Sequence, residues 1–259
     1  MTGLKNKIKS LKPTFGSWIT IGDPVVAEIM AKSGFEWLTI DMEHSAISLD
    51  KAQNLIRIIE LSGCSPLVRV GENNPYLIKR VMDAGAHGVI VPMINNADDA
   101  KKAVNAVKYP PNGIRGVGLA RAQKYGFDFN GYKKWLETES LIIAQIEHVE
   151  GVENLESIIS VEGIDCCIVG PYDLSGSLGL PGEYNNPKVS SELQKIEKIC
   201  LKNKMPLGFH VIPPDYKEVE KYLSKGYTFL AFSLDTLFLG TICSEQVNRL
   251  KNRDINEKT

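Results

Sequence analysis

The chain has 259 residues, of which 43% are apolar and 24% charged, and its formal net charge is −1. This length fits one large α/β domain, and the near-zero charge indicates neither a nucleic-acid-binding protein nor a membrane-surface protein. We find no apolar stretch of roughly 18 residues that could span a membrane, and the basic N-terminus lacks the apolar core of a signal peptide. The five cysteines are odd in number and form no CxxC motif, which favours a reducing cytoplasm.

Short apolar runs rich in Val and Ile alternate with helical segments along the chain. Several of these runs are apolar on both faces, as is typical of strands buried inside a parallel sheet. We therefore expect eight strands, at residues 15–21, 37–43, 66–70, 88–93, 141–147, 165–174, 206–211 and 228–235.

Helix signals fall between these strands. Asp23-Pro24 and Asn74-Pro75 each place a capping side chain before a proline at the first helical position. Ser48 and Asn96 are further predicted caps. Several helices are predicted to end at a glycine, namely Gly34, Gly63, Gly85 and Gly226.

Eight strands alternating with helices predict an α/β fold of the (β/α)8 type, a TIM barrel. One domain would cover residues 1–259, with a polar tail at 251–259 that we expect to fray. An open doubly wound sheet is the alternative, but no GxGxxG motif follows the first strand. The long stretch 109–132 contains Pro110-Pro111 and five glycines, and loops of this length are usually functional.

In parallel barrels the active site lies at the C-terminal ends of the strands. Two carboxylates, Glu147 and Asp173, end adjacent predicted strands. A buried carboxylate is costly unless it is paired or binds a cation, so these two could share one divalent ion that keeps positions open for water and substrate. Alternatively, each could pair with an arginine or cap a helix.

Three other polar side chains follow predicted strands. Asp41 and His44 lie three residues apart, so the carboxylate could orient the imidazole as a general base, although a lone histidine is often structural. Arg69 could hold a substrate carboxylate or stabilise an oxyanion, because burying a guanidinium without an anion is expensive.

The chain resembles the HpcH/HpaI aldolase family, the metal-dependent (class II) pyruvate aldolases. The resemblance spans most of the chain, extends to residues 234–236 in the last predicted strand, and is specific because its motifs occur together and in order. The matching motifs are WLTIDMEH at 37–44, PLVRV at 66–70, MDAG at 82–85, VPM at 91–93, YPPNGIRG at 109–116, QIE at 145–147 and VGPYDLS at 169–175.

This resemblance implies a metal and substrate site. Glu147 and Asp173 match the two ligands of a divalent ion, Mg2+ or Mn2+ or else Co2+. Gln145 matches a glutamine that contacts the substrate, which Asp173 would also adjoin. Tyr172 falls where the family uses a backbone group beside the metal-binding aspartate.

The same resemblance implies catalytic roles for four residues. His44 matches the general base, with Asp41 as its partner. Asp83 matches the aspartate that raises the basicity of that histidine, although the residues alone would make it a helix surface charge. Arg69 matches the arginine that stabilises the enolate.

Two departures concern the half of the site that would bind an aldehyde. The loop at 116–125 looks shorter than in hydroxy-oxo-dioate aldolases, and it carries Arg121 into a region that we expect to face the acceptor substrate. His210 stands where an apolar residue is expected. Structural roles fit both residues as well as catalytic ones, so the aldehyde is left open.

The resemblance implies an enzyme that reversibly cleaves a 4-hydroxy-2-oxo acid, of sugar-acid or dioate type, to pyruvate and an aldehyde. No lysine ends a predicted strand, which disfavours a Schiff-base route. The alternatives are a Claisen-type enzyme acting on a 2-oxo acid and a thioester, and a non-catalytic 2-oxo-acid-binding barrel. Besides these small molecules, the implied partner is a second copy of the chain, in a homo-oligomer (hexamer or trimer) with exchanged C-terminal helices.

Overall fold

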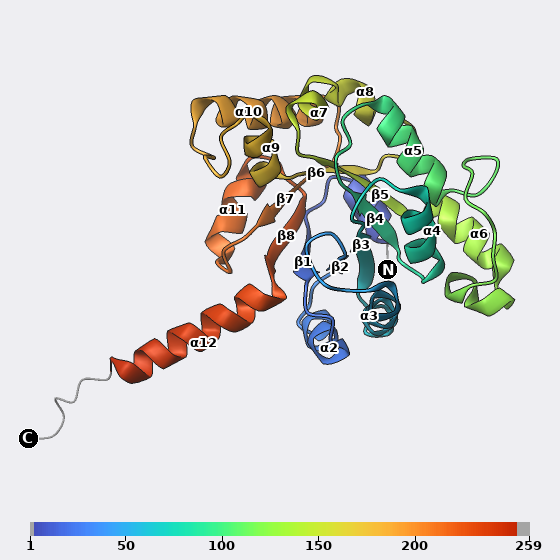
Figure 1. The fold of residues 1–259 in the computed structure, drawn as a ribbon, viewed down its shortest axis with the longest axis horizontal. Helices are drawn as coiled ribbons and strands as arrows, with labels where there is room; N and C mark the ends of the chain where they lie inside the picture. Colours follow the sequence, from blue (N-terminus) through green and yellow to red (C-terminus); the bar gives the residue numbers. More distant parts are fainter. Residues whose placement is uncertain (1–2, 253–259) are drawn as a thin grey trace, which may run out of the picture.

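The computed structural model describes residues 3–252. Eight parallel strands pair in chain order and close into a barrel, which confirms the predicted single-domain (β/α)8 fold (Figure 1). The strands are β1 (Thr14–Ile19), β2 (Trp37–Asp41), β3 (Ser65–Arg69), β4 (Gly88–Val91), β5 (Leu141–Ile146), β6 (Cys166–Val169), β7 (Leu207–Val211) and β8 (Phe229–Leu234).

Helices surround the barrel and begin largely at the predicted caps. Asp23 accepts a hydrogen bond from the backbone of Val25, Asn74 from that of Tyr76, and Asn96 caps in the same way. Ser48 precedes its helix, but its hydroxyl donates to Asp50 and caps no backbone N–H. The helices are α1 (Leu4–Lys9), α2 (Pro24–Lys32), α3 (Leu49–Leu61), α4 (Pro75–Asp83), α5 (Ala97–Val107), the 3-10 helix η1 (Arg121–Gly126), α6 (Phe129–Thr138), α7 (Val149–Glu153), α8 (Leu155–Ile159), α9 (Pro171–Ser177), α10 (Pro187–Lys202), α11 (Tyr216–Ser224) and α12 (Asp235–Lys251).

One predicted strand is too long. The expected strand 165–174 ends at Val169, and α9 starts at Pro171, because proline suits the first turn of a helix and cannot donate to a sheet. Asp173 therefore lies in the first turn of α9 and not at a strand end. The second strand likewise ends at Asp41, which leaves Glu43 and His44 in the following loop.

Large side chains fill the inside of the barrel. Trp37 and Phe229 stack there with ring centroids 4.0 Å apart. Gly16 makes room for this pair, since a Cβ at that position would lie 2.0 Å from the indole of Trp37. The barrel is therefore a packed core and not a pore.

Helix α1 covers the N-terminal end of the barrel. Ile8 is fully buried against the interior cluster. The ammonium of Lys5 donates to the carbonyl of Ser140 at 2.7 Å and to Asp165 at 3.0 Å, and Asp165 also accepts from the backbone of Ile142. Helix α1 thus covers the barrel interior at this end, and active sites of parallel barrels lie at the opposite, C-terminal end of the strands.

The last helix leaves the barrel. Figure 1 shows α12 extending away from the strands and the other helices. Its apolar side chains are correspondingly exposed, among them Leu239, Ile242, Val247 and Leu250. Within residues 3–252, no helix has the length and apolar character needed to cross a membrane. The remainder of the predicted tail, 253–259, lies outside the described residues.

Candidate active site

A pocket of about 330 Å³ opens at the C-terminal end of the barrel. It brings together side chains from five separate segments that sequence reasoning singled out. These are His44, Arg69, Gln145, Tyr172, Asp173 and His210. Trp18, on β1, also lines the pocket and had no predicted role, because a buried aromatic within a strand reads as ordinary core.

Glu147 is buried directly after β5. One carboxylate oxygen accepts a hydrogen bond from the backbone of Met93 at 2.7 Å, and the other accepts from the amide of Gln145. Burial raises the pKa of Glu147 despite these two bonds, and the charges of Glu43 and Asp173 add to the increase. The position of this carboxylate is thus fixed while its negative charge is poorly compensated.

Glu43 was not assigned a role from sequence, but it forms an acidic group with Glu147 and Asp173. Burial raises its pKa, and the charges of Asp41 and Asp173 raise it further against the opposing effect of Arg69. One of its buried carboxylate oxygens has no hydrogen-bond partner. Carboxylates that raise one another's pKa in this way fit a divalent cation, whose charge would offset the repulsion.

The ligand set for such a cation would be small. Among residues 3–252, no group of three or more His, Cys, Asp or Glu side chains is arranged to hold a metal ion. The charges of Glu147 and Asp173 act on each other, and a pair of carboxylates would leave positions of a bound cation open for substrate. Gly170 is needed beside them, since a Cβ there would lie 2.7 Å from the carboxylate oxygen of Glu147 and 2.8 Å from its Cβ.

Arg69 is held on several sides. Its Nε and Nη2 donate to the two oxygens of Asp41 at 3.0 and 2.7 Å, and its Nε lies 3.3 Å from Glu43. The guanidinium carbon stands 4.3 Å from the centre of the Trp18 ring, a cation–π contact. Although burial acts to raise it, the pKa of Asp41 is lowered, because Arg69 and two backbone N–H groups stabilise its charge.

Asp41 therefore has a different partner from the one predicted. Its carboxylate accepts a hydrogen bond from the backbone N–H of His44 at 3.2 Å, while its strong contacts go to Arg69. The imidazole of His44 is 63% exposed, and its Nε2 lies 3.7 Å from Glu43. Asp41 orients the loop that carries His44 and does not hydrogen-bond to its ring.

Asp83 lies at the end of α4 and fixes the long loop. Arg115, from the YPPNGIRG motif, donates to Asp83 at 2.8 Å and to the hydroxyl of Tyr132 at 2.9 Å. Within the described part of the chain, no hydrogen bond or ion pair joins Asp83 to His44. In this single chain the carboxylate of Asp83 thus supports the loop.

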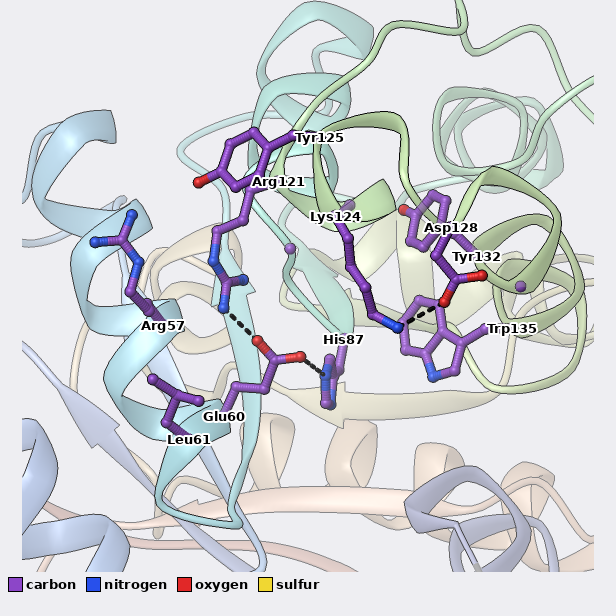
Figure 2. Close-up of a pocket in the computed structure, with 13 residues that line it drawn as sticks. Arg57, Glu60, Leu61, His87, Arg121, Lys124, Tyr125, Asp128, Tyr132 and Trp135 are labelled. Carbon is purple, nitrogen blue, oxygen red and sulfur yellow. Dashed lines mark hydrogen bonds and ion pairs between the residues drawn. The ribbon is translucent and has the colours of Figure 1, made fainter.

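A larger pocket, of about 690 Å³, lies elsewhere on the barrel (Figure 2). Arg121 lines it and donates to Glu60 and, at 3.1 Å, to the carbonyl of Ala84, while His87 lies 3.6 Å from Glu60. These residues stand at the C-terminal ends of α3 and α4, next to the N-terminal ends of the strands. Arg121 was expected to face the acceptor substrate, but the structure places it at the opposite end of the barrel.

The sequence profile of the HpcH/HpaI aldolase/citrate lyase family matches residues 14–239. The chain is 35% identical over 251 residues to the 2-dehydro-3,6-dideoxy-6-sulfogluconate aldolase of Pseudomonas putida, covering 96% of this chain and 97% of that protein. It is 34% identical over 251 residues to the 4-hydroxy-2-oxo-heptane-1,7-dioate aldolase of Shigella flexneri, covering 96% and 92% of the two proteins.

Solved structures agree with these relatives. An HpcH/HpaI aldolase/citrate lyase family protein from Burkholderia cenocepacia J2315 superposes with a TM-score of 0.91 at 30% identity, covering 96% of this chain and 99% of that one. The citrate synthase SbnG superposes with a TM-score of 0.86 at 27% identity, covering 98% and 99%. From its profile match, its relatives and its barrel, this chain belongs to the HpcH/HpaI aldolase/citrate lyase family.

Proposed function

We propose that this protein is a carbon–carbon lyase, an aldolase that reversibly cleaves a 4-hydroxy-2-oxo acid of sugar-acid or dioate type to pyruvate and an aldehyde. The observation that carries this proposal is a group of interacting carboxylates, Glu43, Glu147 and Asp173, next to the pocket that Arg69 and Asp173 line. Aldolases at 34–35% identity over nearly the whole chain support it.

Glu147 and Asp173 would hold the divalent ion, Mg2+, Mn2+ or Co2+. When bound, that ion supplies Lewis-acid polarisation of the substrate's 2-oxo group. Gln145 hydrogen-bonds to Glu147, so it orients this carboxylate while lining the pocket for the substrate. Tyr172 lies beside Asp173 in the first turn of α9, where its backbone can contact the substrate.

The remaining residues transfer one proton and stabilise the electron pair that bond cleavage leaves behind. In cleavage, His44 accepts the proton of the C4 hydroxyl, directly or through a water, and the C3–C4 bond breaks to release the aldehyde. The electron pair stays on the pyruvate unit as an enolate, whose oxygen Arg69 stabilises. Protonation at C3 then gives pyruvate. Asp41 positions Arg69 for this step, and Asp83 positions the neighbouring loop.

Enolate formation can be tested without knowing the aldehyde. We would incubate the protein with pyruvate and Mg2+ or Mn2+ in deuterated water and follow loss of the methyl proton signal by NMR. We expect metal-dependent exchange that Glu147→Ala abolishes, while the control Glu156→Ala, at an exposed site on α8, exchanges at the wild-type rate. Absence of exchange with any divalent ion, or full exchange in Glu147→Ala, would contradict the proposal.

A Claisen-type synthase is the second candidate, because the citrate synthase SbnG resembles this chain closely in structure. Such an enzyme would join a 2-oxo acid to a thioester at similar strand-end residues. Incubation with acetyl-coenzyme A and a panel of 2-oxo acids would then release free thiol, which the aldolase does not. Thiol release without aldehyde-dependent product would favour this candidate.

We further propose that the chain works as a homo-oligomer, a hexamer or a trimer. The support is α12, whose exposed apolar residues include Leu239, Ile242 and Leu250 and which extends away from its own barrel (Figure 1). Apolar side chains on a projecting helix are stabilised when a second copy covers them.

A further inference from the structure

His210 lies on β7, and its ring lines the pocket at the C-terminal end of the barrel that also contains Arg69 and Asp173. The ring packs against Trp18 with centroids 5.4 Å apart, and Trp18 also contacts Arg69. Its Nε2 lies 3.1 Å from the backbone carbonyl oxygen of Ser233. His210 therefore adjoins the substrate pocket without belonging to the acidic group that would bind the metal.

The contact with Ser233 fixes which nitrogen of His210 carries the proton. A carbonyl oxygen only accepts hydrogen bonds, so Nε2 must donate, and the neutral ring keeps its lone pair on Nδ1. Partial burial lowers the pKa of His210 to about 4, and the charge of Arg69 acts in the same direction. The ring is therefore uncharged near neutral pH, with Nδ1 as an acceptor.

Nδ1 can accept a hydrogen bond from a bound ligand. Among residues 3–252, no group donates a hydrogen bond to Nδ1. Nδ1 is also absent from the fully buried polar atoms that lack a partner, so it remains accessible. The ring also keeps part of its surface exposed where it lines the pocket. An accessible acceptor without a protein partner can be satisfied by water or by a donor on the substrate.

The backbone around Ser233 is shaped to hold His210 in this state. Ser233 has a φ of +51°, a left-handed conformation that is unfavourable for a residue with a side chain. The register between β1 and β8 shifts beside it, between Gly16 and Trp18, and Ser17 also donates to the Ser233 carbonyl at 3.1 Å. Such irregularities commonly redirect groups next to active sites.

We propose that His210 selects the aldehyde: its Nδ1 accepts a hydrogen bond from a hydroxyl of the acceptor, so the enzyme prefers hydroxylated aldehydes over alkyl aldehydes of the same size. This inference rests on the proposed aldolase function and narrows it to the sugar-acid type. A carboxylate or sulfonate end would meet the lone pair of a neutral ring at this position, and the nearby guanidinium of Arg69 is already paired with Asp41 and Glu43.

The test compares glycolaldehyde with propanal, which replaces the hydroxyl by a methyl group of similar size. For each acceptor we would measure kcat/KM of aldol addition to pyruvate in the wild type, His210→Asn and His210→Gln. Asparagine places an amide oxygen near the position of Nδ1. Glutamine reaches the Ser233 carbonyl as a donor but has no acceptor at the Nδ1 position.

We expect the wild type to prefer glycolaldehyde, His210→Asn to keep most of this preference, and His210→Gln to lose it by about tenfold, the size of one neutral hydrogen bond. Because the ratio compares two acceptors in one protein, a general loss of structure lowers both kcat/KM values and leaves the ratio unchanged.

Three results would overturn the inference: a wild-type ratio at or below one, which needs no variant; an unchanged ratio in His210→Gln; or an equal fall in both variants. Absence of methyl exchange in the wild type would instead refute the aldolase function, and this inference with it.

Discussion

Arg69 shows how a charged side chain is fixed at the barrel mouth. Its side chain is only 14% exposed, and it would be costly to bury without the carboxylates of Asp41 and Glu43. The bidentate pair with Asp41 fixes the plane of the guanidinium, and Trp18 supports one face. A donor held in this way needs no rearrangement when negative charge develops beside it, which suits it to stabilise an enolate.

The partly buried imidazole of His210 makes a testable contribution to stability. Its pKa is about 4 in the folded protein against 6.5 for the free side chain. Between these values the unfolded chain binds more protons, so the free energy of unfolding rises as the pH rises from 4 to 6.5 and the contribution is lost as the pH falls.

We therefore expect the wild type to lose up to about 3 kcal/mol relative to His210→Gln between pH 6.5 and pH 4, because glutamine does not titrate. Urea unfolding of both proteins across this range measures the difference. Parallel pH profiles would show that His210 titrates normally in the fold.

At the level of single residues, sequence reasoning found most pocket-lining groups but not all of their partners. Asp41 and Arg69 face each other as register partners in β2 and β3, 28 residues apart in the chain. Sequence proximity favoured His44 as the partner of Asp41, because register between strands is set by the closed barrel and is not visible in local sequence. The same reason hid Glu43, because Arg69 on β3 and Asp173 in α9, which both act on its charge, lie far from it in the sequence.

At the level of elements, the strands were predictable because their burial on both faces makes continuous apolar runs. All eight were located, with errors at their ends, the largest at β6, where the proline of α9 ends the strand. Helix α1 was not predicted, since six residues carry too little periodicity. Its position depends on the long-range bonds of Lys5 to Ser140 and Asp165.

Loss of the Lys5–Asp165 contact should destabilise the barrel. The side chain of Asp165 is 1% exposed, so Lys5→Ala would leave a buried carboxylate with reduced compensation. We expect a loss of about 3–5 kcal/mol in the free energy of unfolding. Urea unfolding of Lys5→Ala should be compared with Lys101→Ala, which breaks an exposed ion pair on α5 and should cost less than about 1 kcal/mol. Equal losses of unfolding free energy in the two variants would show that the contact of Lys5 in α1 does not stabilise the barrel.

At the level of the whole molecule, α12 is the helix whose apolar side chains are left exposed by its own chain. In a (β/α)8 barrel the helices form a ring around the strands, whereas α12 contacts β8 and β1 at its start, where Phe238 packs on Phe232, and then extends away from the barrel (Figure 1). Its exposed residues Leu239, Ile242, Val247 and Leu250 lie on one face at helical spacing. This apolar face accounts for the proposed homo-oligomer, because association would bury it.

A charge on this face should therefore dissociate the oligomer. We expect the wild type to sediment as a species several times the mass of one chain, and Ile242→Glu to sediment mainly as smaller species, because burying a carboxylate in an apolar contact is costly. Asn248→Glu adds the same charge on the opposite side of α12, where Asn248 is also exposed, and should leave the mass unchanged. Sedimentation velocity of the three proteins at equal concentration distinguishes these outcomes. A monomeric wild type, or dissociation by both substitutions alike, would show that the apolar face of α12 is not the contact that joins the copies.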